Sequence, residues 1–153
     1  MSKSRIATIA DYVVQELNSL SWSQSFTAER RYIAEYTDKQ LETLKVIVIA
    51  GLDTPSLLSR GSLNHTHVVY VTIQKRVDPT VTADIDALAY LGEEITKYYA
   101  WDSSNNGHRK LAGLATSHVT SAVNDPICDP KVLSENRRFF GGVVLTINEN
   151  ERA

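Results

Sequence analysis

The feature that most constrains the fold is a change in the spacing of apolar residues along the chain. Between residues 6 and 17 the apolar side chains recur at i, i+3, i+4, i+7, i+8 and i+11, which places them on one face of a helix. In FTAERRYIAEY, residues 26–36, apolar and polar residues instead alternate, which is typical of a strand with one buried face. The chain is therefore predicted to pack helices against a sheet.

The same analysis predicts the remaining elements. LKVIVIAG is apolar on both faces apart from Lys45, as in a central strand, whereas HVVYVTIQKRV alternates. The further elements expected are a central strand at 44–50, a strand at 67–77, a helix at 82–100, a strand near 115–123, a short helix at 130–136 and a last strand at 138–148. Ser2 or Ser4 is expected to cap the first helix, and Thr82 the second. The predicted fold class is α+β, a mainly antiparallel sheet packed by two helices, in the order α-β-β-β-α-β-(short α)-β and within one domain spanning residues 1–153.

Two segments do not fit a compact arrangement with short connections. Residues 51–64 and 101–113 are expected to be long loops, and long loops in a small domain are usually functional or disordered. These loops are therefore candidates for contacts with a partner. Gly141-Gly142, within the last predicted strand, indicates a bulge or a close approach of another backbone segment.

Composition and charge argue against several classes of protein. The chain has 16 basic and 18 acidic residues and a net charge of −2, so the basic patch of a DNA-reading domain is not expected. Cys128 is the only cysteine, so no intramolecular disulfide can form. The N-terminus lacks the apolar core of a signal peptide, and no apolar run approaches the roughly 20 residues that span a bilayer. We therefore expect a soluble protein made in a reducing cytoplasm, with no membrane partner.

No motif in the chain predicts catalysis. His65 and His67 would share one face of a strand, but no carboxylate or cysteine lies at a supporting spacing, so no metal site is expected. Cys128 is followed by Asp129, whose charge raises the pKa of a neighbouring thiol, so a packing role is expected rather than a nucleophile. The sequence contains neither a G-x-S-x-G elbow nor a G-x-G-x-x-G phosphate loop. We accordingly predict no catalytic, cofactor-binding or metal-binding residue and no cofactor.

The end of the chain has the most distinctive pattern. In NDPICDPKVLSENRRFFGGVVLTI, residues 124–147, two Asp-Pro pairs flank the cysteine and precede a short polar helix and an alternating strand. Together with IADYVVQELN, FTAERRYIAEY, LKVIVIAG and VVYVTIQKRVD, this ending resembles the tail terminators and related tail-completion (neck) proteins of long-tailed bacteriophages and prophages. The resemblance extends over nearly the whole chain.

This resemblance implies a structural protein of the virion, in its neck or tail, that is made in the host bacterial cytoplasm. Tail terminators form a ring, usually a homohexamer, that stops polymerisation of the tail tube protein and offers a surface to the head-side connector (stopper or adaptor). Genomic DNA passes through the central channel, and neither chemistry nor a cofactor is involved. The Asp-Pro turns would then set the angle at which the short helix and the last strand leave the body.

Two other interpretations remain open. A head-closure (stopper) or adaptor protein of the same neck would assemble by the same logic at a different position. A small enzyme or metal-binding accessory protein would instead use the histidines. For the favoured terminator, the two predicted loops supply the residues expected at contacts with the tail tube or the next subunit, which are Arg60, His108, Arg109 and Lys110.

Overall fold

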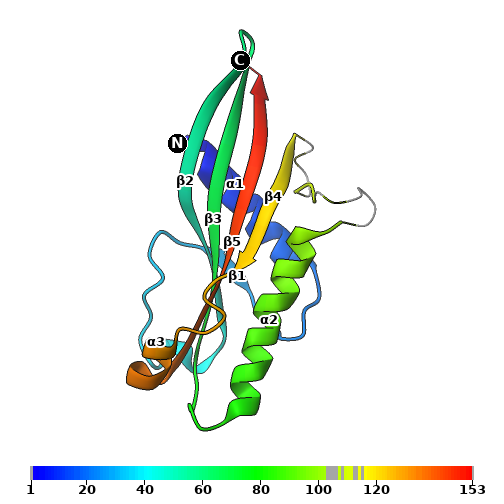
Figure 1. Ribbon diagram of the computed structural model, residues 1–153. Helices are drawn as coiled ribbons and strands as arrows, with labels where there is room; N and C mark the ends of the chain where they lie inside the picture. The colour runs from blue at the N-terminus through cyan, green and yellow to red at the C-terminus, as the bar shows by residue number, and fades with distance from the viewer. Residues whose placement is uncertain (1, 103–106, 108, 112–113, 115, 153) are drawn as a thin grey trace.

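The computed structural model describes residues 2–102, 107, 109–111, 114 and 116–152 (Figure 1). Its elements are α1 (Arg5–Ser19), β1 (Ala28–Arg30), the 3-10 helix η1 (Gln40–Glu42), β2 (Lys45–Ser59), β3 (Ser62–Arg76), α2 (Thr82–Ala100), β4 (Ser117–Asn124), α3 (Pro130–Asn136) and β5 (Arg138–Arg152). They confirm the predicted α+β class and the predicted order of helices and strands. Within this part of the chain, no helix is both long and apolar enough to cross a membrane.

The five strands of the described residues form one sheet in the order β1-β2-β3-β5-β4. Neighbouring strands are antiparallel except β1, which pairs in parallel with β2 over Val46–Val48. β3 and β5 pair along their whole length, from Ser62 with Arg152 to Arg76 with Arg138. β5 therefore lies inside the sheet although it follows every other strand in sequence. The predicted mainly antiparallel sheet is confirmed.

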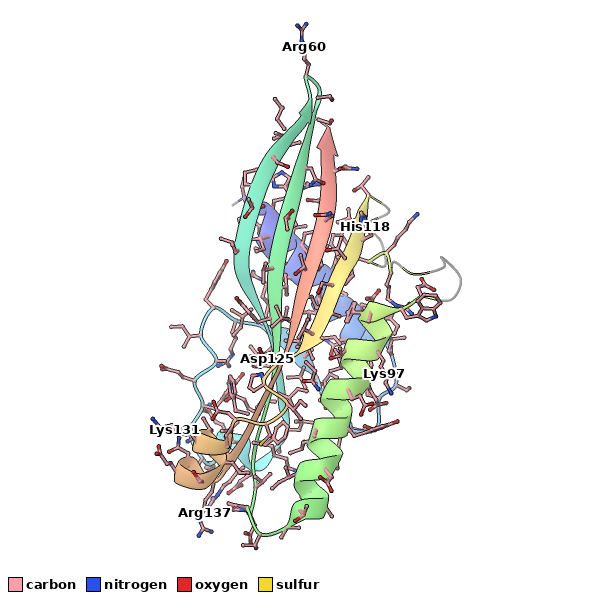
Figure 2. The ribbon with its side chains drawn as sticks, viewed as in Figure 1. Arg60, Lys97, His118, Asp125, Lys131 and Arg137 are labelled. Atoms are coloured by element: carbon pink, nitrogen blue, oxygen red, sulfur yellow. The ribbon has the colours of Figure 1, made fainter. Side chains whose placement is uncertain are left out.

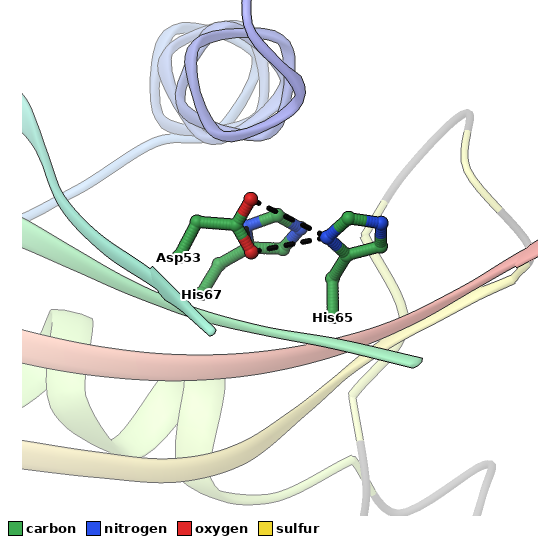
Figure 3. A group of neighbouring side chains, drawn as sticks. All are labelled: Asp53, His65 and His67. Atoms are coloured by element: carbon green, nitrogen blue, oxygen red, sulfur yellow. Dashed lines mark hydrogen bonds and ion pairs between the residues drawn. The ribbon is translucent and has the colours of Figure 1, made fainter. Parts of the chain in front are cut away.

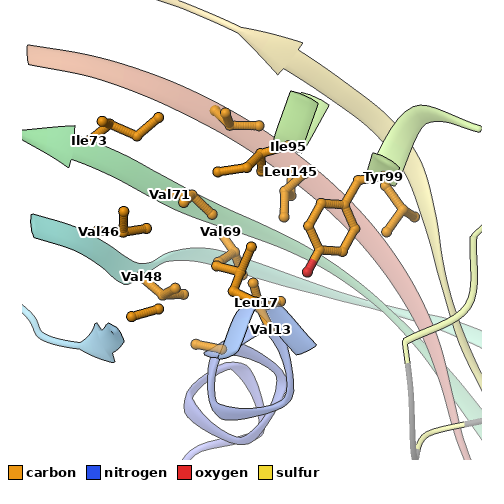
Figure 4. Packing of buried hydrophobic residues seen from close by; sticks show 14 of the residues in the cluster. Val13, Leu17, Val46, Val48, Val69, Val71, Ile73, Ile95, Tyr99 and Leu145 are labelled. Carbon is orange, nitrogen blue, oxygen red and sulfur yellow. The ribbon is translucent and has the colours of Figure 1, made fainter. Parts of the chain in front are cut away.

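The first helix follows from its cap and its apolar stripe. Ser4 has an extended backbone, and its Oγ accepts a hydrogen bond from the backbone N–H of Ala7 (3.3 Å), so Ser4 rather than Ser2 caps α1. The stripe packs on one face of the sheet, with Val13 and Leu17 turned toward the strands (Figure 4). The apolar seam of α2 joins the same core. The buried residues of this core include Val46, Val48, Val69, Val71, Ile73, Leu88, Leu91, Ile95, Tyr99, Val143, Leu145 and Ile147.

Two local predictions are wrong. Thr82 is the first residue of α2 and not its cap, because Val81 holds the N-cap position and makes no side-chain cap. Of the strand predicted at 26–36, only Ala28–Arg30 pairs with β2. The alternation of apolar residues continues beyond this point, but the chain has by then left the edge of the sheet.

Residues 31–44 cover part of the sheet face that is turned away from the helices. Tyr36 and Leu41 pack on Ile47 of β2 in a small second apolar cluster. Gln74 of β3 is buried on the same face and donates a hydrogen bond from Nε2 to the carbonyl oxygen of Ala34 (3.2 Å). The sheet therefore has one face on which α1 and α2 pack and another that residues 31–44 cover in part.

The long loop predicted at 51–64 is wrong, because β2 and β3 form one extended hairpin. β2 continues to Ser59, and β3 begins at Ser62 after a two-residue turn. The strand register shifts at Gly51, which marks a β-bulge. A Cβ on Gly51 would lie 2.5 Å from the Tyr70 ring and 2.7 Å from the Val68 carbonyl oxygen, so only glycine fits there.

The bulge changes which residues of β2 face the helices. Before it, the even-numbered Val46 and Val48 lie in the core under α1. After it, the odd-numbered Asp53 pairs with His67 and shares that same face. A one-residue shift of register moves every following side chain to the other side of the sheet.

The close backbone approach predicted at Gly141-Gly142 is confirmed. Backbone hydrogen bonds of 2.9 Å join Asp125 N–H to the Gly142 carbonyl oxygen and Gly142 N–H to the Pro126 carbonyl oxygen. A Cβ on Gly141 would lie 2.8 Å from the Ile127 carbonyl oxygen. The segment between β4 and α3 thus runs directly against β5, and both glycines leave room for it.

Candidate functional site

The sheet face opposite the helices is uncovered over the outer half of the strands, and Figure 1 looks onto it with α1 behind. The strand register places six apolar residues on this side, and we call them the bare sheet face: Ile49, Leu52, Val68, Tyr70, Val123 and Val144. Ile49, Val68 and Val144 are half-buried, and Ile49 marks the margin of the face because it also packs against the small second cluster. Leu52 is 60% exposed, Val123 49% and Tyr70 41%. Because a contiguous exposed apolar patch on a folded protein commonly marks an interaction site, this face is the first candidate for function.

The outer edge of β2 is also open. β1 covers only Val46–Val48, so the edge from Ile49 to Ser59 has no neighbouring strand among the described residues. Pro55 lies on this edge and has no N–H to donate, which disfavours pairing with a further strand. Contact through the bare sheet face is thereby favoured over pairing of a further strand with this edge of β2.

Of the four residues predicted from the sequence, the structure describes Arg60, Arg109 and Lys110, and Arg60 lies on a different element from the other two. Arg60 is exposed in the turn of the hairpin, at its far tip (Figure 2), and Lys110 is exposed near the end of the connection that follows α2. His108 lies outside the described residues. Arg60 and Lys110 are thus accessible to a partner, but they belong to different elements.

Arg109 is engaged within the protein. Its guanidinium lies 3.7 Å from the centroid of the Tyr98 ring, its Nε donates to the Tyr98 carbonyl oxygen, and its Nη2 donates to the Trp101 carbonyl oxygen (3.0 Å). Its own carbonyl oxygen accepts from Val119 N–H of β4 (2.7 Å). These contacts tie the C-terminal end of α2 to the edge of the sheet, which gives Arg109 a structural role.

A buried polar cluster lies at the base of the hairpin, on the helix-covered face. His65 and His67 of β3 stack with parallel rings whose centroids are 5.4 Å apart. Asp53 of β2 reaches both of them, with its Oδ1 3.1 Å from His65 Nδ1 and 3.4 Å from His67 Nδ1 (Figure 3). On the other side, Glu149 of β5 places Oε1 3.3 Å from His67 Nε2. The expectation that no carboxylate supports these histidines is therefore wrong.

The charge of Glu149 is balanced by a residue from the first turn of α1. Arg5 donates from Nε and Nη2 to the two carboxylate oxygens, each at 2.8 Å. The Glu149 side chain is only 1% exposed. A bidentate arginine–carboxylate pair of this kind is a strong form of charge-assisted hydrogen bonding. It holds the first turn of α1 over the polar cluster.

Cys128 follows the behaviour expected from the sequence. The thiol is partly buried against the core. Burial raises its pKa, the neighbouring charge of Asp129 raises it further, and a hydrogen bond with the backbone of Phe140 opposes both without cancelling them. The thiol is therefore kept protonated, which favours packing over nucleophilic chemistry.

No protein-family model matches this sequence, and no curated protein matches it either.

Proposed function

We propose that this protein is a tail terminator of a long-tailed bacteriophage, a structural protein of the neck. Copies of the chain close into a ring, which caps the tail tube, ends its polymerisation and joins the tail to the head-side connector. The observation that carries the proposal is the bare sheet face, which gives the chain an apolar surface suited to another copy of itself. The resemblance of the sequence to tail terminators supplies the identity of the assembly.

A ring is one assembly that this one-sided surface supports. The bare sheet face lies on one side of the sheet only, so a copy that docks it on a different surface of its neighbour leaves one free surface of each kind at the two ends of the pair. Heterologous contacts of this kind close into a ring when the rotation between copies divides a full turn. Burial of Leu52, Tyr70 and Val123 is expected to supply apolar contact energy at each interface.

The hairpin and the charge of the chain suit the remaining partners. The hairpin carries Arg60 away from the body, to a position where it can reach the tail tube or the next subunit (Figure 2). The net charge of −2 is compatible with a conduit through which genomic DNA moves without being held, because strong binding to DNA needs many cationic contacts to phosphate.

The assembly is tested with the double variant Leu52→Lys/Val123→Lys. Both side chains are exposed, so the fold should persist, whereas two charges on the bare sheet face should prevent ring formation. Negative-stain microscopy and light scattering, with and without tail tube protein, measure the assembly. Tyr90→Lys on α2, at a position that is 54% exposed, is the matched control and should form rings as the wild type does. Rings of normal size and yield from the double variant would contradict the proposal.

The position within the neck is tested in a phage that lacks the gene. Tails longer than normal are expected if the protein ends tube polymerisation. Filled heads that leak DNA, with tails of normal length, would instead identify a head-closure protein and overturn the terminator assignment. Complementation with the Leu52→Lys/Val123→Lys variant should fail, while complementation with Tyr90→Lys should restore normal particles.

A further inference from the structure

We propose that Asp53, His65 and His67 bind one divalent transition-metal ion, with Zn²⁺ as the ion of choice, at the base of the β2–β3 hairpin. One ligand atom from each of the three residues lies within 4.8 Å of the other two. The Asp53 oxygen is 3.1 Å from His65 Nδ1 and 3.4 Å from His67 Nδ1. In a tetrahedral zinc site with bonds of about 2.0–2.1 Å, neighbouring ligand atoms are about 3.3 Å apart, so two of the separations already match.

The hydrogen-bonding state of His67 points to a cation. Its ring is completely buried, and Nε2 faces the carboxylate of Glu149 at 3.3 Å. Because a carboxylate only accepts, Nε2 carries the proton in the neutral ring. Nδ1 then presents a lone pair toward Asp53, and within the described residues it has no hydrogen-bond partner. A buried acceptor that faces a second acceptor is unfavourable, and a metal ion between Nδ1 of His67 and the carboxylate of Asp53 satisfies both.

Glu149 and Arg5 supply the support that metal-bound histidines commonly have. A ligating imidazole usually donates its other N–H to a carboxylate, which fixes the tautomer and orients the ring. Glu149 holds this position toward His67, and Arg5 in turn fixes both oxygens of Glu149 at 2.8 Å. The arrangement leaves Nδ1 of His67 as the ligand atom, aimed toward Asp53.

The choice of metal follows from the donor set. Two imidazole nitrogens and one carboxylate are typical of zinc and related transition metals, whereas Mg²⁺ and Ca²⁺ prefer oxygen ligands alone. Three protein ligands leave a fourth position for water. The Asp53 side chain is 28% exposed, which gives water and the ion a path to the site. His65 Nδ1 lies within hydrogen-bond distance of both Asp53 oxygens (3.1 and 3.3 Å), so the ion would bind His65 in the tautomer that carries its proton on Nε2.

Such an ion would link β2 to β3 immediately beyond the bulge at Gly51. It would fix the hairpin relative to α1 at the place where the strands leave the core. This role is structural and does not depend on the proposed function, because it concerns the order of the hairpin within a single chain.

The test uses tag-free protein treated with chelator, followed by titration with Zn²⁺ in a calorimeter and with Co²⁺ in a visible spectrophotometer. One ion per chain is expected to bind, with the ligand-field bands of a low-coordinate nitrogen and oxygen site and a rise in Tm. Asp53→Asn and His65→Asn should each weaken binding by more than the about 10–100-fold that is typical of residues that only orient a ligand. His118→Asn, a histidine elsewhere on the sheet, is the matched control and should bind as the wild type does.

Two results would overturn the site. One is wild-type protein with no saturable binding of either ion. The other is an Asp53 or His65 variant that is folded by circular dichroism and binds as tightly as the wild type. If both variants fail to fold, the Co²⁺ spectrum of the wild type decides, because absence of the ligand-field bands rejects the site.

Discussion

Glu149 is a carboxylate in the interior of the protein, and its neighbours explain how the fold tolerates it. Removing a charge from water costs several kcal/mol unless partners replace the lost hydration. Arg5 provides two charge-assisted hydrogen bonds, and His67 lies on the other side. At the scale of single residues, therefore, the attachment of α1 to the sheet depends on Arg5 more than on any surface charge of that helix.

We predict that Arg5→Met lowers the free energy of unfolding by about 2–3 kcal/mol, somewhat less than for a fully buried pair because the Arg5 side chain is 39% exposed. The remaining Glu149 would be a buried charge with too few partners. Lys3→Met is the control. Lys3 also forms an ion pair, with Asp11 at 2.7 Å, but its side chain is 59% exposed, so a loss of no more than about 0.5 kcal/mol is expected. Urea unfolding followed by circular dichroism measures both, and equal losses would contradict the prediction.

The sequence by itself indicates only the two histidines of the polar cluster. His65 and His67 stand out because alternate positions of a strand share a face. Asp53 and Glu149 are separated from them by 12 and 82 positions, so only the pairing of strands brings them together. No spacing within a single segment could have indicated the carboxylates.

At the scale of elements, β2 shows why part of the hairpin was predicted as a loop. Its first half, KVIVIA, is apolar apart from Lys45 and strand-forming, but its second half contains Asp53, Thr54, Pro55 and Ser56, which are common in turns. The second half is a strand because β3 pairs with it along its whole length. Pairing with a neighbour overrides local propensity in strands more often than in helices, and the helix predicted at 82–100 accordingly has these bounds in the structure.

The bulge at Gly51 is predicted to be intolerant of any side chain. Gly51→Ala should cost about 1–3 kcal/mol, because the added methyl group overlaps the Tyr70 ring and the Val68 carbonyl oxygen. Gly61→Ala in the hairpin turn is the control, because no atom lies within 4 Å of the new Cβ, and it should change stability by less than about 0.5 kcal/mol. Urea unfolding measures both values. A Gly51 variant as stable as the Gly61 variant would show that the bulge can relax.

The whole molecule presents two unlike sides, and only one of them was visible in the sequence. Alternation within each strand predicts that one face is buried, but it does not say which residues from four strands form the other face. The six residues of the bare sheet face come together through two register shifts, at Gly51 in β2 and at Thr120 in β4. Tyr32 and Ile33, which the alternation assigns to a strand, are instead 69% and 65% exposed outside the sheet.

At this scale we predict that Arg60 and Arg109, which sequence analysis grouped together, behave differently. Arg60→Ala at the hairpin tip should leave stability within about 0.5 kcal/mol of the wild type but impair joining to the tail tube, seen as altered tail length in a complemented phage. Arg109→Ala should lower stability by about 1–3 kcal/mol, because it removes a cation–π contact and two hydrogen bonds to carbonyl groups. Thermal unfolding and tail-length measurement separate the two effects. Loss of stability in the Arg60 variant, or its absence in the Arg109 variant, would contradict this division.

The place of β5 between β3 and β4 has a consequence for synthesis of the protein. While the ribosome is still making this segment, β3 and β4 each display an unsatisfied row of backbone groups, and the apolar side chains of both helices lack part of the surface on which they pack. Long-range strand pairing is slow because distant segments must first meet. Nascent chains are therefore exposed to aggregation until the final strand emerges, and premature termination anywhere before Arg138 would leave a polypeptide without the centre of its sheet.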